Sequence, residues 1–212
     1  MSNRPGFFLT IEGIEGAGKS TVADLLQQSL TLAGFEVVVT AEPGGDDVGN
    51  RIRQLVLDSS NVICDRAELL LFEAARAQHV DMKIRPALKR GVVVISDRFA
   101  DSSQAYQGYA RGIDLDMVKM LNDYAIEGVK PDLTILLDLP AELGLARQQG
   151  IDRVSSEKMA FHEAVRQGFL AVAKHEPGRV VLIDATLSLD EVMRQALAAV
   201  AAHGLRIDGV GE

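Results

Sequence analysis

The sequence has one cysteine, no tryptophan and no long apolar segment. Cys64 alone cannot form an internal disulfide, and no cluster of cysteine and histidine offers the ligands of a zinc site. No apolar run approaches the length needed to span a membrane, and the first residues lack the apolar core of a secretory signal. We therefore expect a cytoplasmic protein with no membrane partner.

Positive charge is also scarce. The chain has 22 lysines and arginines against 30 aspartates and glutamates, a formal net charge of −8, and only 5% aromatic residues. Proteins that hold nucleic acid need clustered basic side chains and often aromatic platforms, so nucleic acid is not an expected partner. The 212 residues can form one sizeable core and show no linker or repeat, which predicts a single domain over 1–212.

A phosphate-binding motif follows the first apolar run, Phe7 to Ile11, and the residue Glu12. The motif reads Gly13-Ile14-Glu15-Gly16-Ala17-Gly18-Lys19-Ser20-Thr21 and fits the pattern G-x-x-x-x-G-K-[ST]. Its glycines let backbone N–H groups converge on phosphate oxygens at the start of a helix. Lysine can then reach the β- and γ-phosphates, and the serine hydroxyl can bind the magnesium ion that bridges them. The motif predicts a site for a nucleoside triphosphate with its metal.

Five apolar runs alternate with helical patterns along the rest of the chain. The runs rich in valine, isoleucine and leucine are 7–11, 36–40, 92–96, 133–138 and 180–184. Helical spacing or capping signals mark 21–33, 49–58, 65–89 with a division at Pro86, 115–126, 141–149, 157–174 and a last helix that begins at Ser188. Continuous apolar strands separated by helices indicate an α/β fold in which helices sandwich a five-stranded parallel sheet.

Ligands of such sheets bind beyond the carboxyl ends of the strands. That rule places four segments along one edge of the sheet: the phosphate-binding loop, residues 42–45, Asp97-Arg98 and residues 184–186.

The combination of motifs closely resembles bacterial thymidylate kinase, over almost the whole chain. The resemblance is carried by 7–21, Glu42-Pro43-Gly44-Gly45, Phe72-Glu73-Ala74-Ala75-Arg76, Asp97-Arg98, Ser103-Gln104-Ala105-Tyr106-Gln107-Gly108 and Pro131-Asp132-Leu133. It implies a P-loop nucleotide kinase that transfers the γ-phosphoryl group of ATP to dTMP, with Mg²⁺ as cofactor. It also implies a homodimer.

The resemblance assigns roles around the phosphates. Arg98 and Arg53 would hold the acceptor phosphate, since guanidinium groups suit phosphate oxygens. Asp97 would hold the metal through water, together with Ser20, and Glu12 would help to order the metal or water. Glu15 would accept from the 3′-hydroxyl of the sugar.

Further roles concern the thymine base and the sugar. Phe72 and Arg76 lie four residues apart, so they share a helix face. The resemblance makes Phe72 the ring that stacks on thymine and Arg76 the donor to its O4 atom. Ser103, Gln104 and Gln107 would offer polar atoms near the base, and Tyr106 would exclude a 2′-hydroxyl.

A lid is expected at about 144–157. Some thymidylate kinases carry an arginine in the phosphate-binding loop, but this chain has Gly16 there, so the charge of the transferred group must be met elsewhere. Arg147 and Arg153 are the candidates in the lid, beside Lys19, Asp97 and Arg98. The four histidines receive no role.

Three other functions remain open at this stage. One is a kinase for other nucleoside monophosphates. Another is a GTPase-type switch, although the chain has no N-K-x-D stretch for guanine. The third is a nucleic-acid-dependent ATPase, which the acidic balance disfavours.

Overall fold

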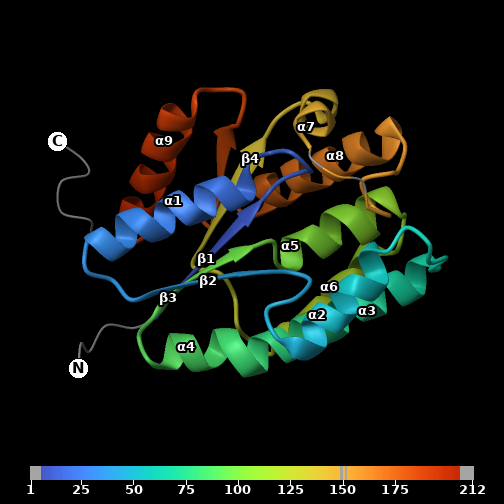
Figure 1. Cartoon of the computed structure of the whole chain (residues 1–212), viewed down its shortest axis with the longest axis horizontal. Helices are drawn as coiled ribbons and strands as arrows, with labels where there is room; N and C mark the ends of the chain where they lie inside the picture. Colours follow the sequence, from blue (N-terminus) through green and yellow to red (C-terminus); the bar gives the residue numbers. More distant parts are fainter. Residues whose placement is uncertain (1–5, 149, 151, 206–212) are drawn as a thin grey trace.

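The computed structural model describes residues 6–148, 150 and 152–205. Its centre is a parallel sheet with the strand order β2-β3-β1-β4-β5 (Figure 1). The strands are β1 (Phe7–Glu12), β2 (Val37–Ala41), β3 (Val93–Asp97), β4 (Leu133–Asp138) and β5 (Val180–Asp184). The predicted five-stranded parallel sheet is confirmed, and each strand lies within two residues of its expected position.

The central strand β1 explains why the apolar runs are continuous. It pairs with β3 on one side and with β4 on the other, where Leu9 lies opposite both Ile95 and Leu133. Every residue of β1 is buried. Because both faces of a parallel sheet are covered by helices, alternation of polar and apolar residues is not needed here.

The helices connect successive strands. They are α1 (Lys19–Leu32), α2 (Asp47–Leu57), α3 (Asp65–His79), α4 (Arg85–Lys89), α5 (Ala100–Ser103), α6 (Leu115–Ile126), α7 (Ala141–Arg147), α8 (Met159–His175) and α9 (Leu189–Ala202), with two π-helical segments, η1 (Val80–Ile84) and η2 (Gln104–Ala110).

Two apolar cores lie on the two faces of the sheet. Leu9 faces the core that contains side chains of α1, α8 and α9. Its neighbour Phe8 faces the other core, with side chains of η1, α4 and α6. Figure 1 shows α1 and α9 on one side of the strands and α4 on the other.

Two helical regions differ from their predicted form. The helix expected over 65–89 is divided earlier than Pro86, because the five-residue segment η1 widens the turn between α3 and α4 and the Arg85 N–H donates to the Val80 carbonyl. Proline lacks an N–H and disturbs the turn before it, which explains this position. The residues before the expected helix 115–126 are also helical: 100–103 form α5 and 104–110 form η2, in which Tyr106 and Gln107 are buried.

The starts of two helices follow the capping rules. The Asp46 carboxylate accepts from the backbone N–H groups of Val48 and Gly49 and so begins α2. The Ser188 hydroxyl accepts from the Glu191 N–H at the start of α9, as expected, while the Glu191 carboxylate binds Arg194 and Gln195 instead of turning back. In the described part of the chain, no helix is long and apolar enough to cross a membrane.

Candidate active site

A cavity of about 690 Å³ opens at the carboxyl ends of β1, β2 and β3. Its walls come from the phosphate-binding loop, the loop after β2, helices α2 and α3, the Asp97-Arg98 turn, η2 and the segment before α8. Its volume suits a ligand of nucleotide size. It lies at the edge of the sheet where the sequence predicts the site.

Three residues of the phosphate-binding loop adopt positive φ angles, which glycine allows. Gly13, Gly16 and Gly18 have φ angles of 144°, 70° and 90°. A Cβ atom on Gly16 would lie 1.9 Å from the Gly144 carbonyl oxygen, so α7 packs directly on the loop. The Lys19 ammonium donates to the Ile14 carbonyl at 2.8 Å and lines the cavity. Burial, with the nearby Arg98, lowers the pKa of Lys19 to about 8.

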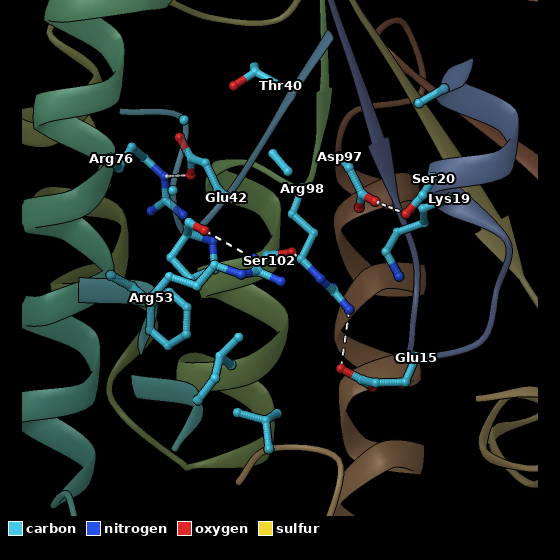
Figure 2. Close-up of a pocket in the computed structure, with 18 of the residues that line it drawn as sticks. Glu15, Lys19, Ser20, Thr40, Glu42, Arg53, Arg76, Asp97, Arg98 and Ser102 are labelled. Atoms are coloured by element: carbon cyan, nitrogen blue, oxygen red, sulfur yellow. Dashed lines mark hydrogen bonds and ion pairs between the residues drawn. The ribbon is translucent and has the colours of Figure 1, made fainter. Parts of the chain in front are cut away.

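The residues expected to bind metal divide into two groups. The Ser20 hydroxyl donates to the Asp97 carboxylate at 2.6 Å, and both residues line the cavity (Figure 2). These oxygen atoms fit a magnesium ion that completes its shell with water and phosphate oxygens. Glu12 differs: it is fully buried and accepts from the Phe99 N–H and the Ser102 hydroxyl, at 2.8 and 2.6 Å. Glu12 supports the turn after β3 and does not line the cavity.

Arg98 lies between the phosphate-binding loop and the side of the cavity that Arg53 and Arg76 line (Figure 2). Its guanidinium donates to the Gly13 carbonyl at 3.0 Å. It also donates to the Glu15 carboxylate at 3.1 Å (Figure 2). Its φ angle is 72°, a conformation that a residue with a side chain rarely adopts. The strained turn aims the guanidinium at the phosphate-binding loop, where an anionic substrate would lie.

Glu15, in the phosphate-binding loop, lines the cavity with its carboxylate. It accepts from Arg98, from the Tyr106 hydroxyl at 2.6 Å and from His162 at 3.3 Å. Burial alone would raise the pKa of Glu15, but the hydrogen bond from His162 and the charges of Arg98 and Lys19 hold it well below its usual range. The carboxylate is therefore ionised near neutral pH.

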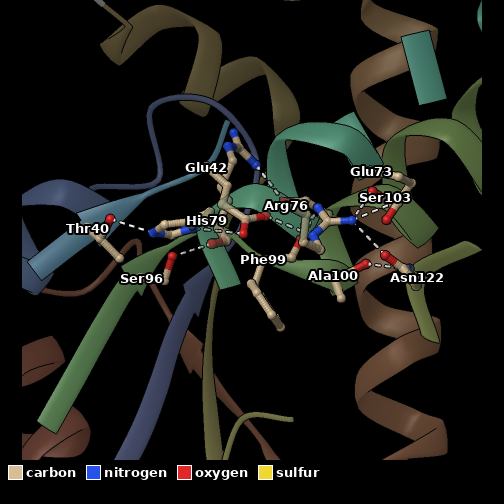
Figure 3. Close-up of polar contacts among 12 residues, drawn as sticks. Thr40, Glu42, Glu73, Arg76, His79, Ser96, Phe99, Ala100, Ser103 and Asn122 are labelled. Atoms are coloured by element: carbon tan, nitrogen blue, oxygen red, sulfur yellow. Dashed lines mark hydrogen bonds and ion pairs between the residues drawn. The ribbon is translucent and has the colours of Figure 1, made fainter. Parts of the chain in front are cut away.

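The buried guanidinium of Arg76 marks the other end of the cavity, next to Phe72. It donates to carboxylates of Glu42 and Glu73 at 2.8 and 2.7 Å (Figure 3). It also donates to the Ser103 hydroxyl, the Asn122 side chain and the Phe99 carbonyl. Burial alone would lower the pKa of Arg76, but the negative charges of Glu73 and Glu42 raise it above its usual value. The network fixes the direction of this cation.

The structure separates the polar residues that were expected at the base. Ser103, Tyr106 and Gln107 line the cavity, and the Gln107 amide donates to Glu68 at 2.9 Å. Gln104 lies on a smaller cavity with Lys119 and Lys130. Residues 103, 106 and 107 share one side of a helical turn and 104 does not, so the placement does not support a base contact by Gln104.

Arg53 reaches the cavity from α2 and donates to the Pro43 carbonyl at 3.0 Å. It thus lies beside the Glu42-Pro43-Gly44-Gly45 loop, and its expected contact with the acceptor phosphate stays a prediction.

Neither lid arginine lines the cavity in this conformation. The Arg147 guanidinium donates to the Ala185 carbonyl after β5, at 2.9 Å. Arg153 donates to the Val56 carbonyl at 2.8 Å and to the Glu68 carboxylate at 2.7 Å. Of the described lid residues, Gln148, Asp152 and Val154 line the cavity. Of the expected lid, 149 and 151 lie outside the described residues.

Several residues to which the sequence gives no individual role support the site. Glu68 is buried and binds Arg111 as well as Arg153, and Arg111 also pairs with Glu157. This cluster ties the lid to α3 and η2. His79 lies between the Glu42 carboxylate and the Thr40 hydroxyl, at 3.0 and 2.7 Å, and His162 contacts Glu15. A buried helix histidine has no periodic signal that distinguishes it, so only the fold shows these contacts.

The chain is similar to thymidylate kinases in sequence and in fold. A family model described as thymidylate kinase matches residues 11–196. The chain is 48% identical over 196 residues to a thymidylate kinase of Halothermothrix orenii, covering 90% of this chain and 94% of that protein. It is 48% identical over 215 residues to one of Desulfovibrio desulfuricans, covering 96% and 99%. The crystal structure of thymidylate kinase from Ehrlichia chaffeensis superposes with a TM-score of 0.77 at 34% identity, covering 92% of this chain and 99% of that one. The chain belongs to the thymidylate kinase family.

Proposed function

We propose that this protein transfers the γ-phosphoryl group of Mg²⁺-bound ATP to dTMP, giving dTDP and ADP. The observation that carries the proposal is the continuity of one cavity. It joins Lys19, Ser20 and Asp97 at the phosphate-binding loop to Arg98 and Glu15, and then to Phe72 and Arg76. A donor and an acceptor held in one cavity can react directly, and the protein then needs to supply position and positive charge.

The donor half consists of the loop, Lys19 and the metal site. Lys19 exchanges its contact with the Ile14 carbonyl for the phosphates of ATP. Ser20 and Asp97 hold Mg²⁺, which when bound neutralises charge on the phosphates. Glu12 stays behind the site and keeps the Asp97-Arg98 turn in place through Phe99 and Ser102.

The acceptor half recognises phosphate, sugar and base. Arg98 and Arg53 hold the phosphate of dTMP, and Glu15 accepts from the 3′-hydroxyl. Phe72 stacks on the base. In the described residues the Arg76 Nη2 atom has one partner, the Phe99 carbonyl, so a second N–H remains for the O4 atom of thymine. Tyr106 packs against Phe161 and Phe169 at centroid distances of 6.2 and 6.1 Å, and its fixed ring would exclude a 2′-hydroxyl.

The segment at about 144–157 is the lid of a single domain in this proposal. Arg147 or Arg153 can assist transfer only after leaving its present partners, Ala185 for the first and Val56 with Glu68 for the second. Lid closure on ATP would supply the free energy for that exchange. We further propose a cytoplasmic homodimer, which the family resemblance supports.

The test is ADP formation from Mg·ATP with dTMP, dUMP, ribothymidine monophosphate, dCMP and dGMP as separate acceptors. We expect strong turnover with dTMP, weaker turnover with dUMP and little with the others. A missing methyl group on the base costs only about 1–3 kcal/mol of discrimination, so dUMP is the acceptor to compare most closely. Equal turnover of all five, or hydrolysis of ATP that ignores them, would contradict the proposal.

A further inference from the structure

Helix α8 carries a buried histidine beside the active site, and the proposed mechanism assigns it no role. His162 has no exposed surface. Its Nδ1 atom lies 3.3 Å from the Glu15 Oε2 atom. Its Nε2 atom is buried and has no hydrogen-bond partner among the described residues. Buried polar atoms are usually hydrogen-bonded. Among the described residues, Glu15 is the one polar partner of this side chain.

The direction of that hydrogen bond follows from the chemistry of Glu15. An ionised carboxylate only accepts, so Nδ1 must carry the hydrogen. The Oε1 atom already accepts from Arg98 at 3.1 Å and from Tyr106 at 2.6 Å. Among the described residues, His162 is therefore the donor on Oε2.

The same helix also holds Tyr106, the other donor on the sugar side. Phe161 and Phe169 of α8 pack on the Tyr106 ring, and Arg98 lies over it at 4.9 Å from its centroid. On the opposite side of the lid, α7 contacts the loop through Gly144, where a Cβ atom would lie 2.5 Å from the Glu15 carbonyl oxygen. Both helices that flank the lid thus contact Glu15: α7 packs against the backbone of Glu15, and α8 contacts its side chain.

We propose that His162 is a positioning residue for substrate sugar recognition: its Nδ1–H orients the Glu15 carboxylate so that this group can accept from the 3′-hydroxyl of the acceptor nucleotide. The inference rests on the proposed function, because it assumes that Glu15 binds that hydroxyl. It adds that the residue governing 3′-hydroxyl selectivity lies on α8, immediately after the lid.

The experiment compares dTMP with its 3′-deoxy analogue as acceptors, in wild type, His162→Phe and His162→Asn. Phenylalanine keeps a ring and removes the donor. The asparagine amide nitrogen occupies nearly the place of Nδ1 and can restore it. We expect wild type to have a lower KM for dTMP than for the 3′-deoxy analogue. In His162→Phe the KM for dTMP should rise about tenfold, which removes that much of the preference. In His162→Asn most of the preference should return. KM for the 3′-deoxy analogue should stay nearly constant.

Val172→Ala is the matched control, since Val172 is also buried on α8 but its side chain has no atom that can hydrogen-bond to Glu15. It should lower the melting temperature and leave the dTMP preference unchanged. An equal loss for both acceptors in His162→Phe would overturn the proposal, because it would indicate packing alone. So would a wild type that turns over both acceptors equally; dTMP turnover itself would then still support the kinase assignment.

A second measurement does not depend on a substitution. The ¹⁵N chemical shifts of the His162 ring in the whole protein report which nitrogen bears hydrogen. We expect Nδ1 to be protonated. A neutral ring with a bare Nδ1 would overturn the proposal, since such a nitrogen cannot donate to Glu15.

Discussion

Arg98 is the residue on which the acceptor site most depends. Replacing it with alanine removes the guanidinium that faces Glu15 and Gly13 and that we place on the acceptor phosphate. Loss of a charged hydrogen-bonding partner in a buried site costs about 2–5 kcal/mol. We predict that kcat/KM for dTMP falls by about a hundredfold or more in Arg98→Ala, in steady-state assays with saturating Mg·ATP.

The matched control is Arg85→Ala, which removes an arginine paired with Asp81 and Glu127 at the surface. Such pairs contribute little, so its kinetics should equal those of wild type. If Arg98→Ala kept its kcat/KM for dTMP and lost only ATP binding, Arg98 would belong to the donor site instead.

Glu12 gives a pH-dependent prediction at the same scale. Burial, followed by repulsion from Asp101, raises its pKa from 4.5 to about 8. The folded state therefore keeps a proton that the unfolded state releases, and the stability from this proton, full below pH 4.5, is lost as pH rises to 8. Glutamine mimics the protonated form. We predict that Glu12→Gln gains stability relative to wild type between pH 5 and pH 8, by about 1–3 kcal/mol.

Urea unfolding of both proteins across this pH range measures the difference. A constant difference from pH 5 to pH 8 would show that Glu12 is already ionised in the folded protein.

Helix α7 and the phosphate-binding loop form one packed unit at the scale of elements. A Cβ atom at position 144 would meet the Glu15 carbonyl oxygen at 2.5 Å and the Ile14 side chain at 2.8 Å. The loop cannot give way without moving its backbone N–H groups. We predict that Gly144→Ala weakens Mg·ATP binding by about tenfold or more in calorimetric titrations, since one displaced hydrogen bond to a charged group costs about 1.5–3 kcal/mol.

Gly178→Ala is the control, because a Cβ atom there meets nothing within 4 Å. Its affinity for Mg·ATP should be that of wild type. Unchanged ATP binding in Gly144→Ala would mean that the loop tolerates displacement by α7.

The elements themselves were predictable because their signals are local. A run such as Val93-Val94-Ile95 predicts a buried strand from neighbouring residues alone, and the loop motif fixes the turn that follows β1. The π-helical segment η2 was not predictable, since its sequence resembles that of an ordinary helix. It carries Tyr106 and Gln107, and both residues line the cavity.

At the scale of the molecule, the parts of the site that escaped prediction join distant segments. His162 and Glu15 are 147 positions apart, and Arg153 and Glu68 are 85 apart. No periodicity relates such pairs, because they meet only once the sheet has ordered the chain. The resemblance to a family supplied roles for the cavity residues. It could not show that Arg147 and Arg153 have other partners in this conformation.

The central claim is that one cavity holds both nucleotides at once. A single molecule that joins the 5′ ends of adenosine and thymidine through a chain of phosphates tests it most directly, by equilibrium titration against the whole protein. Linking two ligands removes the entropic cost of binding the second. We predict that one linked molecule binds per chain, at least about a hundredfold tighter than ATP or dTMP alone. Its binding should prevent both ATP and dTMP from binding. Affinity no greater than that of ATP, with dTMP still able to bind, would contradict the account.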